Sequence, residues 1–404
     1  MSLAEQQALE SEYLMNTYAR KPVELVSGKG MKVLDSEGTE YLDFVSGVGA
    51  VSLGHCHPAV AAAISEQAEK LIHVSNYYFI EHRADVARLL SGLLNTCVPA
   101  EDQTPWKSFF ANSGAEANEC AIKLARLWGK KRKSGAQQVI TLNKSFHGRT
   151  LATLAATAQP AKQEAFQPLP SGFLHSPIND IAALEALFAE QGDAICAVMV
   201  ECVQGESGVH PCTPEFLQAA CDLAHEQGAL FICDEIQCGM YRCGTYPFGF
   251  QHFGITPDVV TIAKGVASGF PTGMCAARDE VAATFEPGDH GSTFGGSCLA
   301  VAAAKATIET LDAIDAAANA KRVGEQLRAQ LAELPHVVEV RGLGLMCACD
   351  FDESVDAGAL ALAGLDVGLL LNSTGPHTLR FLPPLICTTA DVDTMISKVK
   401  DLIA

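Results

Sequence analysis

A single lysine stands in a long uncharged stretch of the chain. Lys264 lies in TIAKGVASGFPTG, residues 261–273, and no other Asp, Glu, Lys or Arg occurs between Asp258 and Arg278. An amine that is removed from water or placed near another cation has a lowered pKa and becomes a nucleophile toward carbonyl groups. Because the apolar run VVTIA precedes it, we interpret Lys264 as a strand-end lysine that could bond a carbonyl covalently.

Three other polar segments follow apolar runs of strand length. Asp234 ends ALFICD, where burial would require a cationic or hydrogen-bonding partner. FFANSGAEAN begins a helix with Ser113, Gly114 and Ala115, whose free N–H groups favour an anion such as phosphate. SFHGRT, residues 145–150, places an aromatic ring, an imidazole and a guanidinium on one turn. Taken singly, the helix start could be an ordinary tight turn and Asp234 a strand-end cap.

Together these four segments match the chemical requirements of pyridoxal phosphate. Its aldehyde requires an amine, its phosphate a helix start, and its pyridine nitrogen a carboxylate that keeps the ring protonated as an electron sink. Lys264, residues 113–115 and Asp234 supply these groups, and the ring of SFHGRT could stack on the cofactor. The helix start carries neither a Walker loop nor a dinucleotide fingerprint. The sequence therefore predicts pyridoxal phosphate rather than a nucleotide.

An α/β domain is expected to carry all four segments. From about residue 107 to residue 278, apolar segments of strand length alternate with helical ones. This alternation is typical of a mostly parallel sheet with helices on both faces, in which ligands bind at the carboxyl ends of the strands. Ahead of it, GKGMKVLDSEGTEYLDF predicts a hairpin, and behind it long helical patterns run from Leu299 to Leu334. We expect a large central domain and a smaller α+β domain assembled from both chain ends.

Charge and hydropathy argue against several classes of partner. The chain of 404 residues has 28 Lys and Arg against 47 Asp and Glu, a net charge of −19, which disfavours nucleic acid and anionic membranes. No apolar run approaches the roughly 20 residues that a membrane span requires. The first residues, MSLAEQQALESEYLMN, lack the apolar segment of a signal peptide, so we expect a cytoplasmic protein without a membrane partner.

Cysteine and histidine patterns suggest neither disulfides nor a metal site. The fifteen cysteines are odd in number and scattered singly, and several lie in apolar strands, where thiols behave as small hydrophobes. HCH, residues 55–57, invites a zinc interpretation but lacks a second ligand cluster at metal spacing. We expect a loop there.

A series of motifs covers almost the whole chain. In order, they are YLMNTYAR, GKGMKVLDSEGTEYLDFVSGVGAVSLGHCHP, ANSGAEANECAIKLAR, SFHGRT, VECVQGESGV, ICDEIQCGMYRCG, PDVVTIAKG, HGSTFGG and LRFLPPL. In this series the chain resembles the class III, fold type I pyridoxal-phosphate aminotransferases, and within that class it is most similar to the acetylornithine aminotransferases. The resemblance implies a seven-stranded-type sheet in a large domain, residues 66–304, and a small domain from residues 1–65 and 305–404.

The resemblance also implies the cofactor site. Lys264 would bond the aldehyde and Asp234 would pair with the pyridine nitrogen, which makes both residues catalytic. Gln237 would lie beside the ring hydroxyl and Phe146 would stack on the ring. The phosphate would be held by Ser113, Gly114, Ala115 and Thr293. Because Thr293 would reach it from a partner subunit, a homodimer with shared active sites is expected.

Five further positions resemble the family's substrate site. Arg149 and Arg380 match its carboxylate clamps, since a guanidinium grips carboxylate bidentately. Glu206 matches a switch acid that pairs with Arg380 while an amine donor is bound and swings away for glutamate. Ser292 and Val48 complete the set. Each arginine would, outside its motif, be interpreted as an ordinary ion-pair residue.

Val48, in FVSGVGAV, bears on the choice of substrate. Ornithine aminotransferases of this type carry tyrosine there, whereas a small apolar residue suits a donor whose α-amine is masked by an acyl group. The resemblance implies transfer of the terminal amino group of N-acetylornithine to 2-oxoglutarate, giving N-acetylglutamate semialdehyde and glutamate, a step of arginine biosynthesis. Succinylornithine, ornithine, acetyl-lysine and 4-aminobutyrate remain alternative donors. A catalytically idle, cofactor-binding regulatory protein is the alternative from another class.

Overall fold

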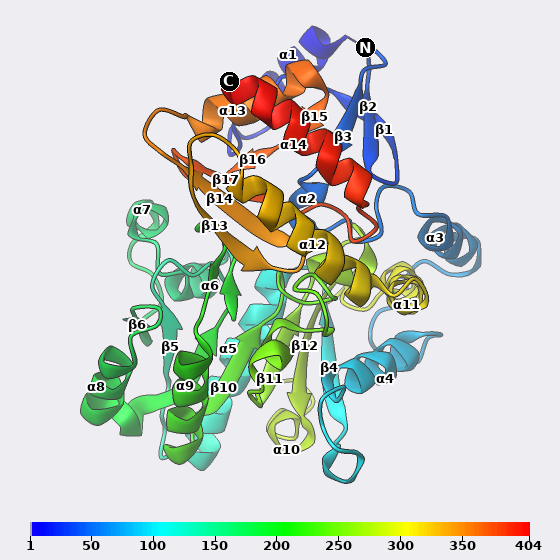
Figure 1. The fold of residues 1–404 in the computed structure, drawn as a ribbon. Coiled ribbons are helices and arrows are strands. Elements are labelled where there is room, and N and C mark those ends of the chain that lie inside the picture. Colours follow the sequence, from blue (N-terminus) through cyan, green and yellow to red (C-terminus); the bar gives the residue numbers. More distant parts are fainter. Residues whose placement is uncertain (1) are drawn as a thin grey trace.

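A seven-stranded sheet forms the centre of the larger part of the molecule in the computed structural model, which describes residues 2–404 (Figure 1). The strand order is β4-β12-β11-β10-β7-β5-β6, and all neighbours are parallel except β12, which is antiparallel to β11 and β4. The strands are β4 (Trp106–Ala111), β5 (Gln138–Leu142), β6 (Phe173–Ser176), β7 (Ile195–Val200), β10 (Leu230–Asp234), β11 (Val259–Ile262) and β12 (Gly273–Arg278). The expected mostly parallel sheet is confirmed.

Helices cover both faces of this sheet because its strands are apolar on both sides. In β7, Ala197 and Met199 pack in one buried cluster with α5 (Gly114–Arg132), whereas Val198 and Val200 pack in another with α9 (Pro214–Glu226). Alternate residues of a strand point to opposite faces, so α5 and α9 cover opposite faces. The other helices of this part are α3 (Pro58–Lys70), α4 (Arg83–Leu94), α6 (Leu151–Ala156), α7 (Pro160–Gln163), α8 (Ile181–Gln191), α10 (Asp279–Ala282) and α11 (Cys298–Ala313).

The smaller part combines both ends of the chain, which come together at the top of Figure 1. One sheet has the order β1-β2-β3-β15, where Leu42 of β3 pairs with Leu369 of β15, and a second has the order β13-β14-β17-β16. The elements are α1 (Leu3–Tyr13), β1 (Leu25–Lys29), β2 (Lys32–Asp35), β3 (Glu40–Asp43), α2 (Ser46–Gly49), α12 (Ala316–Ala332), β13 (Val337–Leu343), β14 (Met346–Phe351), α13 (Ala357–Ala363), β15 (Leu369–Leu370), β16 (Asn372–Ser373), β17 (Thr378–Phe381) and α14 (Thr389–Ile403). A two-stranded ribbon, β8 (Val203–Gln204) and β9 (His210–Pro211), lies between β7 and α9 in sequence.

The N-terminal hairpin expected in GKGMKVLDSEGTEYLDF is confirmed. Strands β2 and β3 pair antiparallel, with Lys32 opposite Leu42. The turn is closed by Asp35, whose Oδ1 accepts the N–H groups of Glu37 at 2.9 Å and Thr39 at 2.8 Å. A short acidic side chain at a turn makes such bonds readily.

The expected domain boundaries fall within helices. Residues 65 and 66 lie in α3, and residues 304 and 305 lie in α11, which packs against α3. The division into 1–65, 66–304 and 305–404 therefore stays a prediction, while the shared sheets show that both chain ends build the smaller part.

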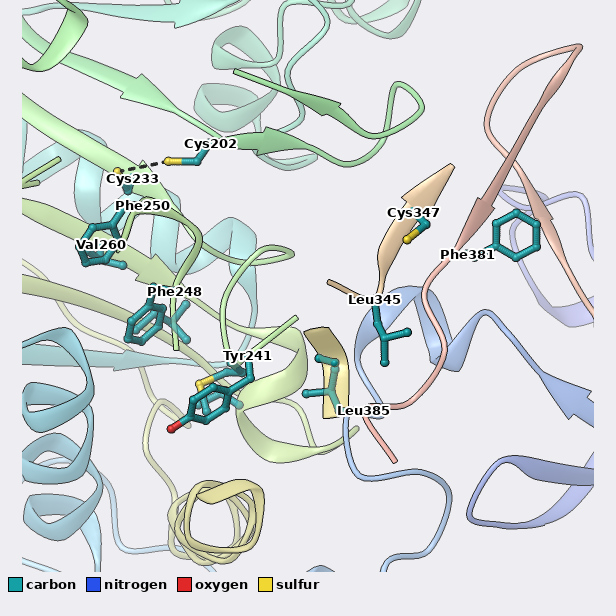
Figure 2. Close-up of a cluster of buried hydrophobic side chains, with 14 of the residues drawn as sticks. Cys202, Cys233, Tyr241, Phe248, Phe250, Val260, Leu345, Cys347, Phe381 and Leu385 are labelled. Carbon is teal, nitrogen blue, oxygen red and sulfur yellow. Dashed lines mark hydrogen bonds between the residues drawn. The ribbon is translucent and has the colours of Figure 1, made fainter. Parts of the chain in front are cut away.

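The buried core continues from one part of the molecule into the other. Figure 2 shows members of one cluster, to which Phe248 and Val260 of the larger part and Leu345 and Phe381 of the C-terminal part belong. Close packing of this kind transmits displacements instead of absorbing them. Residues on the facing sides of the two parts therefore keep fixed positions relative to one another.

All fifteen cysteines are free, and only Cys56 and Cys97 are exposed. Cys202 and Cys233 face each other in Figure 2, with their Sγ atoms 3.9 Å apart. Burial raises the pKa of Cys233 to about 11, which keeps this thiol protonated and apolar in character.

The HCH segment forms a structural turn. His55 Nε2 lies 2.7 Å from Asp43 Oδ2, and His57 Nδ1 accepts the Ala59 N–H at 3.3 Å where α3 begins. Among residues 2–404, no three His, Cys, Asp or Glu side chains gather as metal ligands would. In the same range, every helix is too short or too polar to cross a membrane.

Candidate active site

A cavity of about 360 Å³ lies where β4, β10 and β11 end. Nine of the expected site residues line it: Ser113, Gly114, Ala115, Phe146, Arg149, Glu206, Asp234, Gln237 and Lys264. In the strand pairing, Asp234 stands beside Thr261, three residues before Lys264, so the two strands deliver the acid and the amine to one edge of the sheet. The cavity therefore brings together all four segments that sequence analysis singled out.

Lys264 begins a short 3₁₀ turn directly behind β11. Its φ of 43° is uncommon for a residue with a side chain. Such conformations persist where the surroundings over-determine them, and they cluster at functional sites. Burial lowers the pKa of Lys264. The uncharged, nucleophilic form of the amine is thus more populated near neutral pH than in an exposed lysine.

Asp234 is buried and is held by donors on several sides. Its Oδ2 lies 2.7 Å from His147 Nδ1 and accepts a hydrogen bond from Asn118 Nδ2 at 2.8 Å, while its Oδ1 accepts the Ile236 N–H at 3.1 Å. Although burial alone acts in the other direction, the hydrogen bond and charge of Asp234 raise the pKa of His147. A carboxylate has about four acceptor positions, so Asp234 retains capacity for another donor.

The start of α5 forms one wall of the cavity. Ser113 is the N-cap residue, and its Oγ accepts the Glu116 N–H at 3.2 Å. A Cβ atom added to Gly273 would lie 2.1 Å from the Ser113 carbonyl oxygen, and one added to Gly114 would lie 2.7 Å from Ile236 Cδ1. Only glycine allows these close approaches, which fix the helix start against the ends of the strands.

Phe146 lines the cavity, and two cationic side chains lie near its ring. Its N–H donates to Glu201 Oε2 at 2.9 Å, which fixes the backbone at the ring. The Arg149 guanidinium lies 5.5 Å and the Lys162 amine 5.7 Å from the ring centroid. Both distances are within the range of cation–π attraction.

Glu206 and Arg380 form an ion pair at the cavity edge. Arg380 Nη1 lies 2.8 Å from Glu206 Oε1, and Gln237 Nε2 donates to the same oxygen at 3.3 Å. Arg380 also donates to Asn372 Oδ1 through Nε at 3.2 Å and Nη2 at 2.9 Å. Burial alone would raise the pKa of Glu206, but the charges of Arg380 and Lys264 lower it. Glu206 is therefore anionic at neutral pH.

Besides Arg380, which reaches the cavity edge through Glu206, three expected site residues lie outside the cavity lining. Val48 belongs to α2 and packs against a separate apolar cluster, with φ at 61°. Ser292 and Thr293 lie in the loop before α11, where Ser292 Oγ accepts a hydrogen bond from Asn112 Nδ2 at 3.1 Å and Thr293 is exposed. Asn112 itself lines the cavity, so this loop lies next to the site without entering it.

Comparison with known proteins agrees with this geometry. The profile of the family described as aminotransferase class-III matches residues 14–403. The chain belongs to the class-III aminotransferases.

Relatives of this aminotransferase match it over nearly the full length. It is 44% identical to an acetylornithine aminotransferase of Caldanaerobacter subterraneus over 400 residues, 98% of each chain. The crystal structure of acetylornithine aminotransferase from Elizabethkingia anophelis has a TM-score of 0.86 and 30% identity, covering 100% of this chain and 99% of that one. An ornithine aminotransferase from Toxoplasma gondii, described with partial occupancy of PLP at its active site, has a TM-score of 0.91 and 30% identity, covering 99% and 94%.

Some residues that line the aminotransferase cavity, or contact its lining, were not assigned by sequence analysis. Glu201 directly follows β7 as Asp234 ends β10, and the same strand-end rule could have identified it. Asn118 lies four residues after Gly114, hence on the same face of α5. His147 was part of a quoted motif but had no role. Lys162 of α7 had no local signal, because only tertiary structure brings α7 to Phe146.

Proposed function

We propose that this aminotransferase binds pyridoxal phosphate in the cavity beside Lys264 and transfers the terminal amino group of N-acetylornithine to 2-oxoglutarate. The products are N-acetylglutamate semialdehyde and glutamate. One observation carries the proposal: a single cavity presents a buried amine, a buried acid–imidazole pair and a helix start, with the Glu206–Arg380 pair at its edge.

The chemistry of the lining residues fits the cofactor. When bound, pyridoxal phosphate supplies an aldehyde that takes up the amino group and a ring that withdraws electrons. Lys264 would hold the aldehyde and Asp234 the ring nitrogen, for which His147 and Asn118 orient the carboxylate. The start of α5 would hold the phosphate, because its first N–H groups and the positive end of the helix dipole point that way. Phe146 would cover the ring and Gln237 would lie beside its hydroxyl.

Lys264 would also act as the base. With the substrate amine in the site, the free Lys264 Nζ would take the proton from the substrate carbon and hold it for return. The lowered pKa of Lys264 favours the uncharged base that this step requires.

Two arginines would distinguish the substrates. Arg149 would bind the carboxylate far from the reacting amine in both half-reactions. With N-acetylornithine the reacting carbon carries no carboxylate, so Glu206 stays paired with Arg380. With glutamate, the α-carboxylate would take the place of Glu206 on Arg380. One cavity would thus serve both half-reactions.

We propose a homodimer that shares its active sites. Large apolar side chains gather near Thr293 on the surface: Tyr77 is 91% exposed, Phe79 fully exposed and Phe294 60% exposed. Asn76, beside the two aromatic residues, donates to the Ser292 and Gly295 carbonyl oxygens at 2.8 Å and 3.1 Å, which holds the two segments together. Exposed apolar patches of this kind mark interfaces, and a second copy would cover this one.

A panel of amino donors tests the proposed substrate. N-acetylornithine, N-succinylornithine, ornithine, acetyl-lysine and 4-aminobutyrate are assayed with 2-oxoglutarate, and we expect the highest kcat/KM with N-acetylornithine. Lys264→Ala serves as the inactive control. A preference for ornithine or 4-aminobutyrate would contradict the assignment. An absorbance spectrum unchanged by every donor would instead support the idle, regulatory alternative.

A further inference from the structure

The segment that carries Glu206, residues 205–208, lies in the connection from β8 to β9. Gly208 has a φ of 114°, a conformation that favours glycine. A Cβ atom added to it would lie 3.1 Å from Arg341 Nη2 and 3.3 Å from Thr378 Cγ2. The sheet of the C-terminal part thus lies directly against this segment.

Arg341 of β13 anchors the far end of the segment. Its side chain is only 8% exposed, and its Nε donates to the Gly208 carbonyl oxygen at 2.8 Å. The two terminal nitrogens donate to Asp350 Oδ2 at 2.7 Å and Oδ1 at 2.9 Å, and Nη1 also lies 3.0 Å from the exposed Glu339. A bidentate pair fixes the plane of a guanidinium. The Arg341 Nε–H group is therefore held in one orientation, toward the Gly208 carbonyl oxygen.

The near end of the segment is held as well. The Gly205 N–H donates to Glu201 Oε1 at 3.3 Å, and the Gly205 carbonyl oxygen accepts from Arg380 Nη1 at 3.0 Å. Between these anchors, the Glu206 side chain is 26% exposed and bonds only to the side chains of Arg380 and Gln237. The backbone is fixed at both ends, whereas the carboxylate between them is held by these two side chains alone.

The sheet of β13, β14 and β17 carries Arg380 and anchors the segment that carries Glu206. Arg380 and Thr378 lie on β17, and Thr378 Oγ1 donates to Asp350 Oδ1 at 2.6 Å. Asp350 holds Arg341, which holds the segment that carries Glu206. The position of Glu206 relative to Arg380 is thus set by a closed ring of hydrogen bonds.

We propose that Arg341 and Asp350 are positioning residues for Glu206. They fix the backbone of residues 205–208, so that the alternation between substrates is confined to the Glu206 side chain. This inference rests on the proposed role of Glu206 as the switch acid. The competing explanation is a structural brace, which would stabilise the fold and affect both half-reactions alike.

The first test measures each half-reaction of the holoenzyme separately by single-turnover absorbance. Arg341→Lys keeps the charge but not the planar fork. We expect the N-acetylornithine half-reaction to slow about tenfold and the glutamate half-reaction by less than about twofold, the effect of one lost charge-assisted hydrogen bond. Asp350→Asn, which removes the charge that orients Arg341, should give the same asymmetry.

Arg328→Lys is the matched control. Arg328 Nη1 donates to the Gly344 carbonyl oxygen at 2.9 Å, a guanidinium-to-glycine bond at the turn between β13 and β14. Because it does not contact residues 205–208, both half-reactions should keep their wild-type rates. A structural brace that acts through the general stability of this sheet would slow the half-reactions equally in Arg328→Lys.

A double-mutant cycle decides whether Arg341 acts through Glu206. In a Glu206→Gln background, Arg341→Lys should have almost no further effect on the donor half-reaction, because non-additivity reports a shared route. Additive losses would overturn the inference while leaving the proposed function intact. Equal rates for Glu206→Gln and wild type in both halves would overturn the switch itself, and the inference with it.

Amide hydrogen exchange gives a readout that does not depend on catalysis. We expect the amides of residues 203–211 in the holoenzyme to exchange faster in Arg341→Lys and Asp350→Asn, and at the wild-type rate in Arg328→Lys. Unchanged exchange in both variants would overturn the proposed anchoring, even if the half-reaction rates changed.

Discussion

At the scale of single residues, the site gives its acid and its amine opposite environments. Asp234 has three hydrogen-bond donors around it, which stabilise its negative charge. One of them, His147, is buried beside it. Lys264 is instead removed from water, which lowers its pKa, although the nearby acids Glu206, Asp234 and Glu201 act in the other direction. The site thus stabilises a carboxylate and makes a free amine easier to form, as an electron-withdrawing cofactor beside a base requires.

Lys264 is expected to be the lysine that binds the cofactor covalently. Borohydride reduction of the holoenzyme, followed by peptide mapping, should place the label on Lys264 and on no other lysine. Lys162 is the informative competitor, because it lies near Phe146 and burial lowers the pKa of its amine as well. Label that survives in Lys264→Ala but disappears in Lys162→Ala would contradict the assignment.

Glu206 is expected to affect one half-reaction only. In Glu206→Gln, Arg380 stays uncompensated when N-acetylornithine binds, and an unpaired buried charge costs several kcal/mol, so this half-reaction should slow about tenfold or more. The glutamate half-reaction should be retained or improved. Single-turnover spectra measure both. Glu286→Gln, which removes an exposed ion pair with Lys131 at 3.1 Å, should change neither. Equal losses in both halves would make Glu206 a structural acid.

At the scale of elements, strand ends of the central sheet carry the acids and the base of the site. Glu201 follows β7, Asp234 ends β10 and Lys264 comes two residues after β11. Because these are three neighbouring parallel strands, the three side chains lie at one edge of the sheet. Glu235, the next residue after Asp234, turns away from the cavity and accepts the N–H groups of Gly249 at 2.7 Å and Phe250 at 2.8 Å. It joins the end of β10 to a buried loop.

Glu235 should make stability depend on pH. Burial raises the pKa of Glu235 from its ordinary value of 4.5 to about 8. Because the folded state holds this proton more tightly, its stabilising contribution is complete below about pH 4.5 and is lost as the pH rises through about 8, at up to about 1.4 kcal/mol per pH unit. Denaturant unfolding across this range should show that slope in the wild type and a smaller slope in Glu235→Gln. Identical slopes would mean that Glu235 is ionised in the folded protein.

At the scale of the whole molecule, the loop around Thr293 and the aromatic surface beside it form the proposed dimer interface. We expect a dimer by sedimentation, and we expect Phe79→Asp to weaken it, since the ring is fully exposed in the single chain. A monomer that retains full activity would contradict the shared-site arrangement.

Thr293→Val should loosen the cofactor without changing the fold. If the hydroxyl reaches the phosphate of the partner subunit's site, its loss weakens pyridoxal-phosphate binding by about 1.5 to 3 kcal/mol. Equilibrium titration of the apoenzyme measures this. Thr394→Val, on an exposed face of α14 where the hydroxyl bonds its own helix, is the control and should bind normally. Equal affinity in both variants would remove Thr293 from the phosphate site.

The sequence by itself determined the elements and the residues at their ends. Asp234, Lys264 and the 113–115 helix start could be recognised because a polar group after an apolar run, or a small residue at a helix start, is a local pattern. The same local pattern is present at Glu201, which directly follows β7. The alternation of strands and helices predicted a mostly parallel sheet, but it did not predict that β12 is antiparallel to its neighbours.

Only the tertiary structure decided which distant residues meet. Arg341 and Gly208 are 133 residues apart in the chain, and Lys162 reaches Phe146 only through the placement of α7. Val48 resembles a residue of the substrate site, and its positive φ and its packing against an apolar cluster are visible only in the tertiary structure. Local patterns report the conformation and burial that a segment prefers. Contacts between distant segments depend instead on how the whole chain packs, because each contact must be compatible with all the others.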